Sequence, residues 1–314
     1  MNIDKRIYVA GHNGMVGSSI VRALVRQGYK DIVTSDRSEV DLTNQAAVSQ
    51  FFKKNDIGVV YNAAAKVGGI VGNANYPGDF ILQNLAIQNN IAMACLETNV
   101  DRYVFLGSCC IYPKYCKQPM REDYLLTGTL EPTNRSYAVA KVAGIVTCQA
   151  LYEQYGMKSV CPMPINLFGT GDNLDPVNSH VIPGLMRRFH EAKLRGDTES
   201  TIWGSGNVRR EYMHVDDCAD AILFLTDKFD DGEMVNVAPG EELTTRATAE
   251  AVAKVVGYEG RLIQDTSKPD GTERKLADPS KITALGWYPK LDFYESLSRT
   301  YEDFKGEILT SRWR

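Results

Sequence analysis

The stretch RIYVAGHNGMVG (6–17) decides the fold class of this chain. It begins with the apolar pattern of a short buried strand and ends in a GxxGxxG turn formed by Gly11, Gly14 and Gly17, and a helix is expected from about 15 to 28. The first glycine of such a turn permits the tight bend, the second lets the backbone approach a pyrophosphate, and the third allows close packing of helix and strand. The helix N-terminus favours bound negative charge. The stretch therefore predicts a dinucleotide-binding site.

The next expected strand, DIVTSD (31–36), contains the residues that choose between NAD and NADP. Its last residue, Asp36, is placed to accept hydrogen bonds from the ribose 2′-hydroxyl of NAD. Arg37 follows directly and is able to clamp the 2′-phosphate of NADP instead. These two residues leave both cofactors open.

Strand and helix patterns alternate through the first half of the chain, which predicts an α/β fold built on a Rossmann-type doubly wound parallel sheet. After Gly169 the elements become shorter and mixed, which predicts a smaller mixed α/β C-terminal unit for the substrate. We expect a dinucleotide-binding domain over 1–168, joined by 211–230, and a substrate domain over 169–314. The expected strands are 6–11, 31–36, 58–65, 103–108, 159–169, 201–206, 210–215 and 261–265, and the expected helices are 15–28, 43–55, 79–98, 136–155, 181–195, 216–228, 245–256 and 293–308.

Composition excludes several classes of protein. Hydrophobic residues make up 44% and charged residues 24% of the 314 residues, and the net charge is −4, so neither disorder nor a basic surface that coats nucleic acid is expected. The chain has no apolar run of roughly 18 residues and no signal peptide, so no membrane partner is expected. Seven cysteines without a CxxC pair predict reduced thiols in a cytoplasmic protein. The four histidines lack metal-ligand spacing, so no metal is expected.

A YxxxK pair, Tyr137 and Lys141, follows the fourth expected strand, which ends at Ser108. On a helix the pair lies one turn apart on one face. Tyrosine has a pKa of about 10, and a neighbouring ammonium is expected to lower the pKa of Tyr137 and so make it a better proton donor. Ser108 stands at the carboxyl end of a strand, where open α/β sheets bind their ligands, and is able to hold a substrate carbonyl against Tyr137.

Cys110 and His180 form a second candidate pair for moving protons at carbons next to a ketone. Both residue types also occur in purely structural roles, since cysteine is often buried and a lone histidine is usually structural. Cys109 stands beside Cys110, and alternation along a strand predicts that one of the two side chains turns away from the site.

Together with REYMHVDD (210–217), these motifs resemble the extended short-chain dehydrogenase/reductase family. Within it, longer stretches are similar to the branch that makes GDP-L-fucose. The resemblance covers nearly the whole chain and is carried by AAAKVGGI (63–70), GSCCIYPK (107–114), QPMREDYLLTGTLEPTNRSYAVAK (118–141), NSHVIP (178–183), RRFHEA (187–192), WGSG (203–206) and SKPDGT (267–272).

The resemblance implies an enzyme that epimerises C3 and C5 of GDP-4-keto-6-deoxy-D-mannose and then reduces its C4 ketone with NADPH. It makes Ser108, Tyr137 and Lys141 the reductase triad, and Cys110 and His180 the base and acid of epimerisation. It implies substrate contacts at Arg188, Trp203, Arg210 and Asp270. It implies NADP(H) contacts at Gly11, His12, Asn13, Gly14, Met15, Val16, Gly17, Asp36, Arg37, Asp41, Leu42, Leu106, Gly107, Lys141, Pro164, Asn166, Leu167 and His180.

Two positions depart from the family pattern. The usual Ser-Ser-Cys is Ser108-Cys109-Cys110 here, and Asn13 replaces an arginine that often helps to bind the 2′-phosphate. Arg37 still matches, so NADP(H) remains the expected cofactor. A homodimer is also expected, because 79–98 and 136–155 are too apolar for fully wetted helices and such helices pair across a two-fold axis in the resembling family.

Four alternative functions fit the sequence less well than this hypothesis. A nucleotide-sugar dehydratase needs an Asp-Glu acid–base pair where Cys109 and Cys110 stand. A GDP-mannose 3,5-epimerase also places a cysteine before Ile-Tyr-Pro but performs no net reduction. A GDP-L-colitose synthase differs in the sugar it takes. A non-catalytic dinucleotide sensor has no need of the intact set Ser108, Tyr137 and Lys141.

Overall fold

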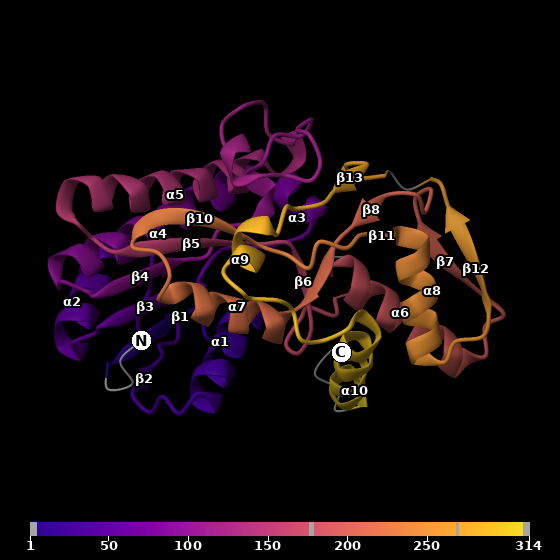
Figure 1. Ribbon diagram of the computed structural model, residues 1–314. Helices are drawn as coiled ribbons and strands as arrows, with labels where there is room; N and C mark the ends of the chain where they lie inside the picture. Colours follow the sequence, from indigo (N-terminus) through magenta and orange to yellow (C-terminus); the bar gives the residue numbers. More distant parts are fainter. Residues whose placement is uncertain (1–4, 176–178, 268–269, 310–314) are drawn as a thin grey trace.

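The computed structural model describes residues 5–175, 179–267 and 270–309. Its centre is a sheet of six parallel strands in the order β10-β5-β4-β3-β1-β2 (Figure 1). Most of its strand residues are buried and apolar, as expected for a sheet covered on both faces. The strands are β1 (Ile7–Ala10), β2 (Ile32–Val33), β3 (Val59–Asn62), β4 (Arg102–Phe105), β5 (Ser159–Pro164) and β10 (Asp231–Val237).

Helices cover both faces of this sheet. One layer is formed by α1 and α7, which pack against each other, and the other by α2, α4 and α5. This arrangement confirms the predicted doubly wound parallel sheet. The helices are α1 (Met15–Arg26), α2 (Gln45–Asn55), α4 (Pro77–Glu97), α5 (Arg135–Tyr155) and α7 (Val215–Thr226), with the short α3 (Ile70–Asn75) ahead of α4.

The order of the strands fixes where a ligand can bind. β1 lies between β2 and β3, so the chain leaves β1 toward one edge of the sheet and later returns to its other side. Ligands of open α/β sheets bind outside the carboxyl ends of the strands at such a switch point. The glycine turn, residues 11–17, stands at this point because it follows β1 directly.

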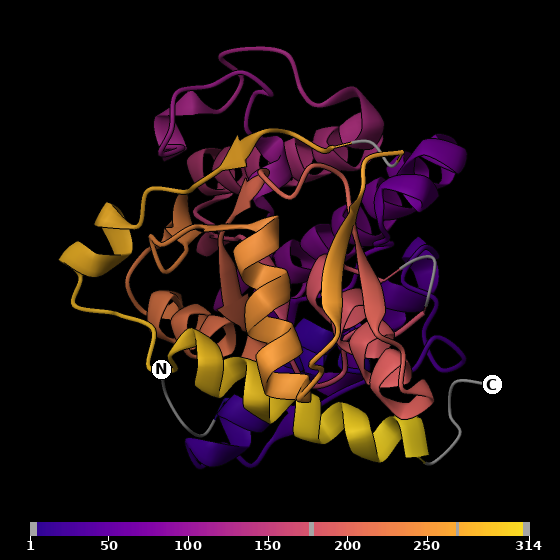
Figure 2. The ribbon, with the colours of Figure 1, turned by 90° about the vertical axis from the view of Figure 1, so that its right-hand side faces the viewer.

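The second unit has its own hydrophobic core, which includes Phe168, Phe189, Ile202, Val252 and Phe304. Figure 2 shows β7 (Glu199–Trp203) beside β12 (Arg261–Asp265), with α10 (Phe293–Leu309) crossing beneath α8 (Thr245–Val256). The remaining elements are β6 (Asn166–Phe168), α6 (Val181–Arg195), β8 (Arg209–Arg210), β9 (Tyr212–His214), β11 (Leu243–Thr244), β13 (Arg274–Lys275) and α9 (Ser280–Ala284). In this unit β8 pairs with β11 and β13, and β6 pairs with β9.

Several of the predicted strands end early, and for two of them the structure shows where the chain goes instead. The strand expected over 159–169 divides at Ile165 into β5 and β6, and β6 leaves the central sheet to pair with β9. Pro164 lies at this division and has no N–H group to donate to a ladder. The strand expected to end at Ser108 ends at Phe105, because Cys109–Ile111 form a 3-10 turn instead.

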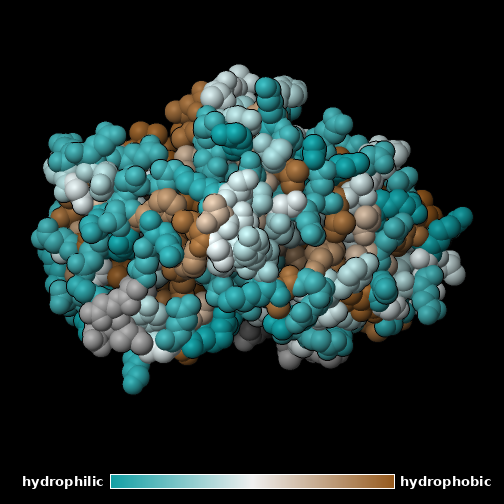
Figure 3. All heavy atoms as spheres, viewed as in Figure 1, coloured by the Kyte–Doolittle hydropathy of each residue, from teal (hydrophilic) through white to brown (hydrophobic). Residues whose placement is uncertain are grey.

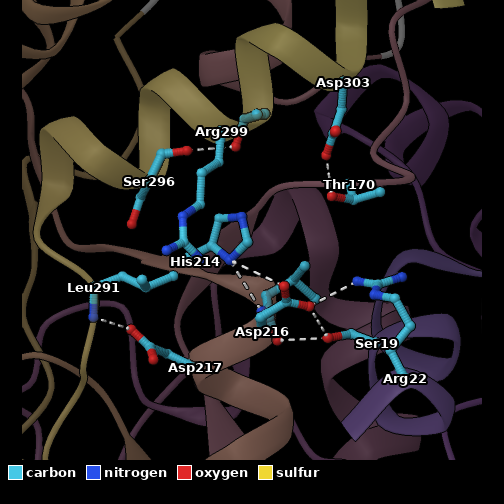
Figure 4. A network of polar contacts seen from close by, with 12 residues as sticks. Ser19, Arg22, Thr170, His214, Asp216, Asp217, Leu291, Ser296, Arg299 and Asp303 are labelled. Atoms are coloured by element: carbon cyan, nitrogen blue, oxygen red, sulfur yellow. Dashed lines mark hydrogen bonds and ion pairs between the residues drawn. The ribbon is translucent and has the colours of Figure 1, made fainter. Parts of the chain in front are cut away.

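A polar network fastens the two units together (Figure 4). Asp216 of α7 accepts hydrogen bonds from Ser19 Oγ at 2.6 Å and from Arg22 Nη2 at 2.7 Å, both on α1. The neighbouring Asp217 accepts a hydrogen bond from the backbone N–H of Leu291 at 3.0 Å, just ahead of α10. The helix that begins at the glycine turn is therefore fixed to α7, and α7 to the C-terminal segment.

The face of the molecule drawn in Figure 3 is mostly hydrophilic, and its apolar side chains form small separate groups. Among the residues that the structure describes, no helix is both long and apolar enough to cross a membrane.

Candidate active site

The glycine turn has the geometry that a bound pyrophosphate requires. Gly11 has a φ of +79°, and a Cβ on Gly17 would lie 2.1 Å from the carbonyl oxygen of Gly11, so both positions need glycine. Gly14 caps α1 without a side-chain hydrogen bond to its first turn. The N–H groups at the start of α1, around Met15 and Val16, are therefore available to an anion.

Asp36 is held by the glycine turn itself. Asn13 Nδ2 donates a 2.5 Å hydrogen bond to Asp36 Oδ1, and His12 Nε2 lies 3.8 Å from the same oxygen. Arg37 is exposed, and Asp41 lies close enough for the positive charge of Arg37 to contribute to the lowered pKa of Asp41, after two hydrogen bonds from Thr43. At the end of the site expected to bind the ribose, the carboxylate of Asp36 is thus hydrogen-bonded to Asn13, whereas the guanidinium of Arg37 is exposed.

The other predicted cofactor positions lie at the carboxyl ends of neighbouring strands. Leu106 and Gly107 follow β4, and the backbone N–H of Gly107 donates to the carbonyl of Pro162 at 2.9 Å. Pro164 ends β5, and Asn166 and Leu167 begin β6. Leu42 lies between Asp41 and α2, where its carbonyl accepts a 2.9 Å hydrogen bond from Asn90 Nδ2.

Four predicted catalytic residues come together beside the end of β4. Ser108 Oγ accepts a hydrogen bond from the backbone N–H of Cys110 at 3.4 Å, and the hydroxyl lies close enough to the Tyr137 phenol and the Cys110 thiol to lower the pKa of each. Lys141 Nζ lies 5.6 Å from the centroid of the Tyr137 ring and donates a 2.7 Å hydrogen bond to the carbonyl of Leu106. α5 places the tyrosine and the lysine on one face, one turn apart, as expected.

Burial dominates the pKa values in this cluster. It lowers the pKa of Lys141 to about 8, because the charged form loses solvent. It raises the pKa of Tyr137 well above its ordinary value, and the hydrogen bond to Ser108 only partly opposes that rise. The expectation that Lys141 lowers the pKa of Tyr137 is therefore wrong for this structure. The ammonium of Lys141 is directed at the carbonyl of Leu106, not at the phenol.

The two adjacent cysteines differ from the predicted arrangement. They lie in a 3-10 turn, where successive side chains are about 120° apart, so strand alternation does not separate them, and both are buried. Burial raises the pKa of Cys110 to about 11, whereas the hydrogen bond to Ser108 and the charges of Lys275 and Lys141 oppose that rise. Cys109 lies nearer the second unit, since Lys275, Glu211 and Arg210 all act on its thiol.

His180 lies directly before α6, with half of its side chain exposed, and pairs with Asp172. Its Nδ1 is 3.3 Å from Asp172 Oδ1, and this hydrogen bond raises the pKa of the imidazole. Within the described part of the chain, no recorded contact of His180 reaches Ser108 or Cys110. The structure therefore assembles four of the five predicted catalytic residues directly.

The predicted substrate residues gather around the turn after β7. The guanidinium carbon of Arg188 lies 4.7 Å from the centroid of the Trp203 ring, which is 48% exposed. Asp270 Oδ1 accepts a 2.9 Å hydrogen bond from the backbone N–H of Ser205. A Cβ on Gly271 would lie 3.1 Å from Arg210 Nη2, which brings Arg210 beside the same turn.

Comparison with known proteins shows the family of the chain. Residues 7–238 match the model of the NAD dependent epimerase/dehydratase family. The chain belongs to that family.

Within the NAD dependent epimerase/dehydratase family, two similar relatives are both named GDP-L-fucose synthase. The protein from Arabidopsis thaliana is 52% identical over 95% of this chain and 92% of its own length, and that from Escherichia coli K12 is 47% identical over 96% of each. A solved structure of a GDP-L-fucose synthetase from Naegleria fowleri bound to NADP has a TM-score of 0.91 at 27% identity, covering 99% of this chain and 96% of that one. A relative named GDP-L-colitose synthase, from Yersinia pseudotuberculosis, is 34% identical over 96% of this chain and 98% of its own length.

Two residues beside the candidate active site, Asp172 and Lys275, have no signal in the sequence. Asp172 lies in a turn-rich loop, and Lys275 follows a charged stretch, so neither has a local pattern that sets it apart. Their proximity to His180 and to the two thiols comes only from the fold. Among the described residues, no group of three or more His, Cys, Asp or Glu side chains is placed to hold a metal ion.

Proposed function

We propose that this protein is a bifunctional epimerase-reductase that converts GDP-4-keto-6-deoxy-D-mannose to GDP-L-fucose with NADPH. The observation that carries the proposal is the convergence of Tyr137, Lys141 and Cys110 on the hydroxyl and strand end at Ser108. One cluster thus contains the proposed reductase residues, Ser108, Tyr137 and Lys141, together with the thiol of Cys110 as the proposed base. The names of the relatives at 47–52% identity support the same reaction.

The residues present fit NADP(H). The uncapped start of α1 accepts a pyrophosphate, and the exposed guanidinium of Arg37 accepts the 2′-phosphate. The carboxylate of Asp36, which would repel that phosphate, is engaged by Asn13. When bound, NADPH supplies the hydride that C4 of the sugar receives.

Epimerisation depends on the acidity of carbons next to the C4 ketone. Ser108 is placed to donate a hydrogen bond to the ketone oxygen, which stabilises the enolate formed when a proton leaves C3 or C5. We assign Cys110 as the base that removes the proton and His180 as the acid that returns one to the opposite face. Burial raises the pKa of the Cys110 thiol to about 11, and the positive charges of Lys275 and Lys141 oppose that rise in the direction of the thiolate that this role requires.

Reduction needs a proton at the C4 oxygen. Tyr137 is a neutral phenol at neutral pH because burial raises its pKa. An alkoxide forming at C4 is a stronger base than a phenolate, so Tyr137 is able to donate its proton to it. Lys141, anchored on Leu106, places a positive charge 5.6 Å from the centroid of the Tyr137 ring, which opposes the effect of burial on the phenolate without overcoming it.

The second unit offers the groups that a GDP moiety needs. Arg188 and Arg210 are the proposed diphosphate contacts, because a guanidinium binds phosphate oxygens in a bidentate manner. Trp203 presents an exposed aromatic face beside Arg188 on which a base is able to stack. Asp270 is the proposed contact for the polar edge of the nucleotide.

Incubation of the protein with GDP-4-keto-6-deoxy-D-mannose and NADPH tests the function. We expect stoichiometric loss of NADPH absorbance and GDP-L-fucose as the product identified by NMR. Epimerised ketone without NADPH consumption would instead indicate a pure 3,5-epimerase. Cofactor binding without any turnover would indicate a dinucleotide sensor.

The runner-up is a GDP-L-colitose synthase, which acts on a 3,6-dideoxy keto sugar. Its relative is 34% identical, against 47% and 52% for the two GDP-L-fucose synthases. A direct competition between the two keto sugars separates the candidates. A kcat/KM at least about tenfold higher for the 3-hydroxy sugar is expected, and the reverse preference would favour the runner-up.

We also propose a cytoplasmic homodimer. All seven cysteines are free thiols, as a reducing compartment requires. α4 and α5 pack side by side and expose Leu82, Met93, Val139 and Val146, a group that a second copy of the same helices is able to cover. Light scattering at micromolar concentration should give the mass of a dimer, and a monomer mass would contradict the proposal.

A further inference from the structure

Asp172 is a buried carboxylate whose position calls for an explanation. Its side chain is only 3% exposed. Oδ1 accepts a 2.8 Å hydrogen bond from the backbone N–H of Asn173 and lies 3.3 Å from His180 Nδ1. Oδ2 is buried without a hydrogen-bond partner among the described residues. Burial of a carboxylate with one unsatisfied oxygen costs stability, so its presence points to a functional gain.

The contact decides which ring nitrogen of His180 carries a proton. A carboxylate only accepts, so Nδ1 must be the donor of the 3.3 Å hydrogen bond. In the described part of the chain only Nδ1 has a partner, which leaves Nε2 as the nitrogen open to a ligand. The imidazole is therefore oriented so that Nε2 is the atom that takes up and gives back protons.

The carboxylate also offsets the field of a helix. His180 immediately precedes the 15-residue α6, whose positive N-terminal end disfavours an imidazolium at this position. Among the described residues, Asp172 is the ionisable group recorded to act on His180, and its effect has the opposite sign. Without it, the histidine would be mostly neutral at neutral pH and a poor acid.

We propose that Asp172 is a positioning residue that holds His180 in the Nδ1–H form and keeps it charged, so that Nε2 protonates C3 and C5 of the sugar. The proposal rests on the proposed epimerase function. Asp172 is itself held in place by the loop, where Gly169 and Gly171 both have positive φ angles and the Asp172 N–H donates to the Gly169 carbonyl at 3.1 Å.

The first test does not need substrate. Titration of the ring nitrogens by NMR, with the His180 signals assigned by their loss in His180→Asn, should show the Nδ1–H tautomer in the wild type. In Asp172→Asn the pKa of His180 should fall and the Nε2–H tautomer should appear. Asp303→Asn is the control, because it removes a charge beside the same loop, where the recorded hydrogen bond of Asp303 is accepted from Thr170 Oγ1. Unchanged His180 signals in Asp172→Asn would overturn the proposal whatever reaction the enzyme performs.

The second test measures solvent deuterium exchange at C3 and C5 against pH. Asp172→Asn should shift the alkaline limb of exchange to lower pH and slow exchange about tenfold or more above neutrality. In a His180→Asn background the same substitution should have no further effect, since a residue that acts only through His180 has nothing left to position. Additive losses in the double variant would refute the positioning role. A wild type that neither exchanges nor reduces the sugar would instead count against the proposed function alone.

Discussion

Lys141 donates its hydrogen bond to the main-chain carbonyl of Leu106, at 2.7 Å, and not to the hydroxyl of Tyr137. This bond ties the first turns of α5 to the chain that leaves β4, which is where Ser108 begins the 3-10 turn. It holds the ammonium beneath the reacting groups, 5.6 Å from the Tyr137 ring centroid, in a buried position. The carbonyl of Leu106 thus fixes the position of Lys141 relative to Ser108 and Tyr137.

The rate of reduction should fall as the pH rises through about 8. Burial lowers the pKa of Lys141 to that value, so the ammonium is present below it and lost above it. Single-turnover oxidation of NADPH at several pH values measures this limb. Lys141→Arg, which stays charged, should flatten it. A wild-type rate that is constant from about pH 7 to about pH 9 would contradict the assignment.

Tyr137→Phe should lower the rate of reduction by about 10²–10⁴-fold, because the C4 alkoxide loses its proton donor. Cofactor binding should persist, since the glycine turn and Arg37 are untouched. Fluorescence titration with NADPH and the loss of its absorbance with keto sugar measure the two properties separately. Retention of most of the activity would show that another group supplies the proton.

Cys110→Ser should abolish deuterium exchange at C3 and C5 while leaving hydride transfer possible. A hydroxyl is too weak a base to take a carbon-bound proton, but Ser108, Tyr137 and Lys141 remain in place. Some GDP-6-deoxy sugar of the D series should therefore form, which NMR identifies.

Cys109→Ser is the control for the adjacent thiol, which lies in surroundings similar to those of Cys110. Both thiols are buried, and Lys275 acts on both of them. Exchange should persist in Cys109→Ser because Ser108 acts on the thiol of Cys110 and has no recorded effect on that of Cys109. Loss of exchange in Cys109→Ser together with its survival in Cys110→Ser would reverse the two roles.

Glu211→Gln should destabilise the fold and change its pH dependence. The fully buried carboxylate accepts hydrogen bonds from the backbone N–H groups of Gly240 at 2.9 Å and Ala277 at 2.5 Å, and an amide has only one oxygen to offer them. We expect a loss of about 1–3 kcal/mol in the free energy of unfolding, measured by urea denaturation. The exposed Glu250→Gln should change it by less than about 0.5 kcal/mol.

The pH dependence has a definite sign. Burial raises the pKa of Glu211 from 4.5 to about 7, so the folded state binds this proton more tightly than the unfolded state does. The contribution of Glu211 to stability should fall as the pH rises from about 4.5 to about 7. The variant should lack this slope, and an unaltered slope would show that Glu211 does not titrate as a buried acid.

The parts that the sequence predicts well are those with a local signal. α6 and α8 have the expected bounds, and the glycine turn, Ser108, Tyr137 and Lys141 take the expected places, because hydrophobic period and motif spacing are local properties. What escaped prediction depends on distant segments. β10, which has no strand expected over its residues, pairs with β5, and Asp172 reaches His180 across a turn-rich loop.

The wrong expectations have physical causes as well. The lowered pKa of Tyr137 was inferred from the spacing of Lys141 alone, but desolvation outweighs a nearby charge once both groups are buried. The separation of Cys109 from Cys110 assumed that β4 continues, whereas the chain turns at Ser108, whose hydroxyl accepts from the backbone N–H of Cys110 at 3.4 Å. Neither the burial of Tyr137 nor the turn at Ser108 can be inferred from the local spacing of residues.

The pairing of β10 with β5 has a consequence for synthesis on the ribosome. β5 has β4 on one side and receives its other neighbour only after residues 169–230 have been made. Until then the nascent chain exposes an unpaired strand edge rich in apolar side chains, which is a hazard for aggregation. A fragment that stops at residue 168 would keep that edge open permanently. The cofactor half is therefore not a detachable module, because its central sheet is closed only when β10, which lies within the following residues, has been made.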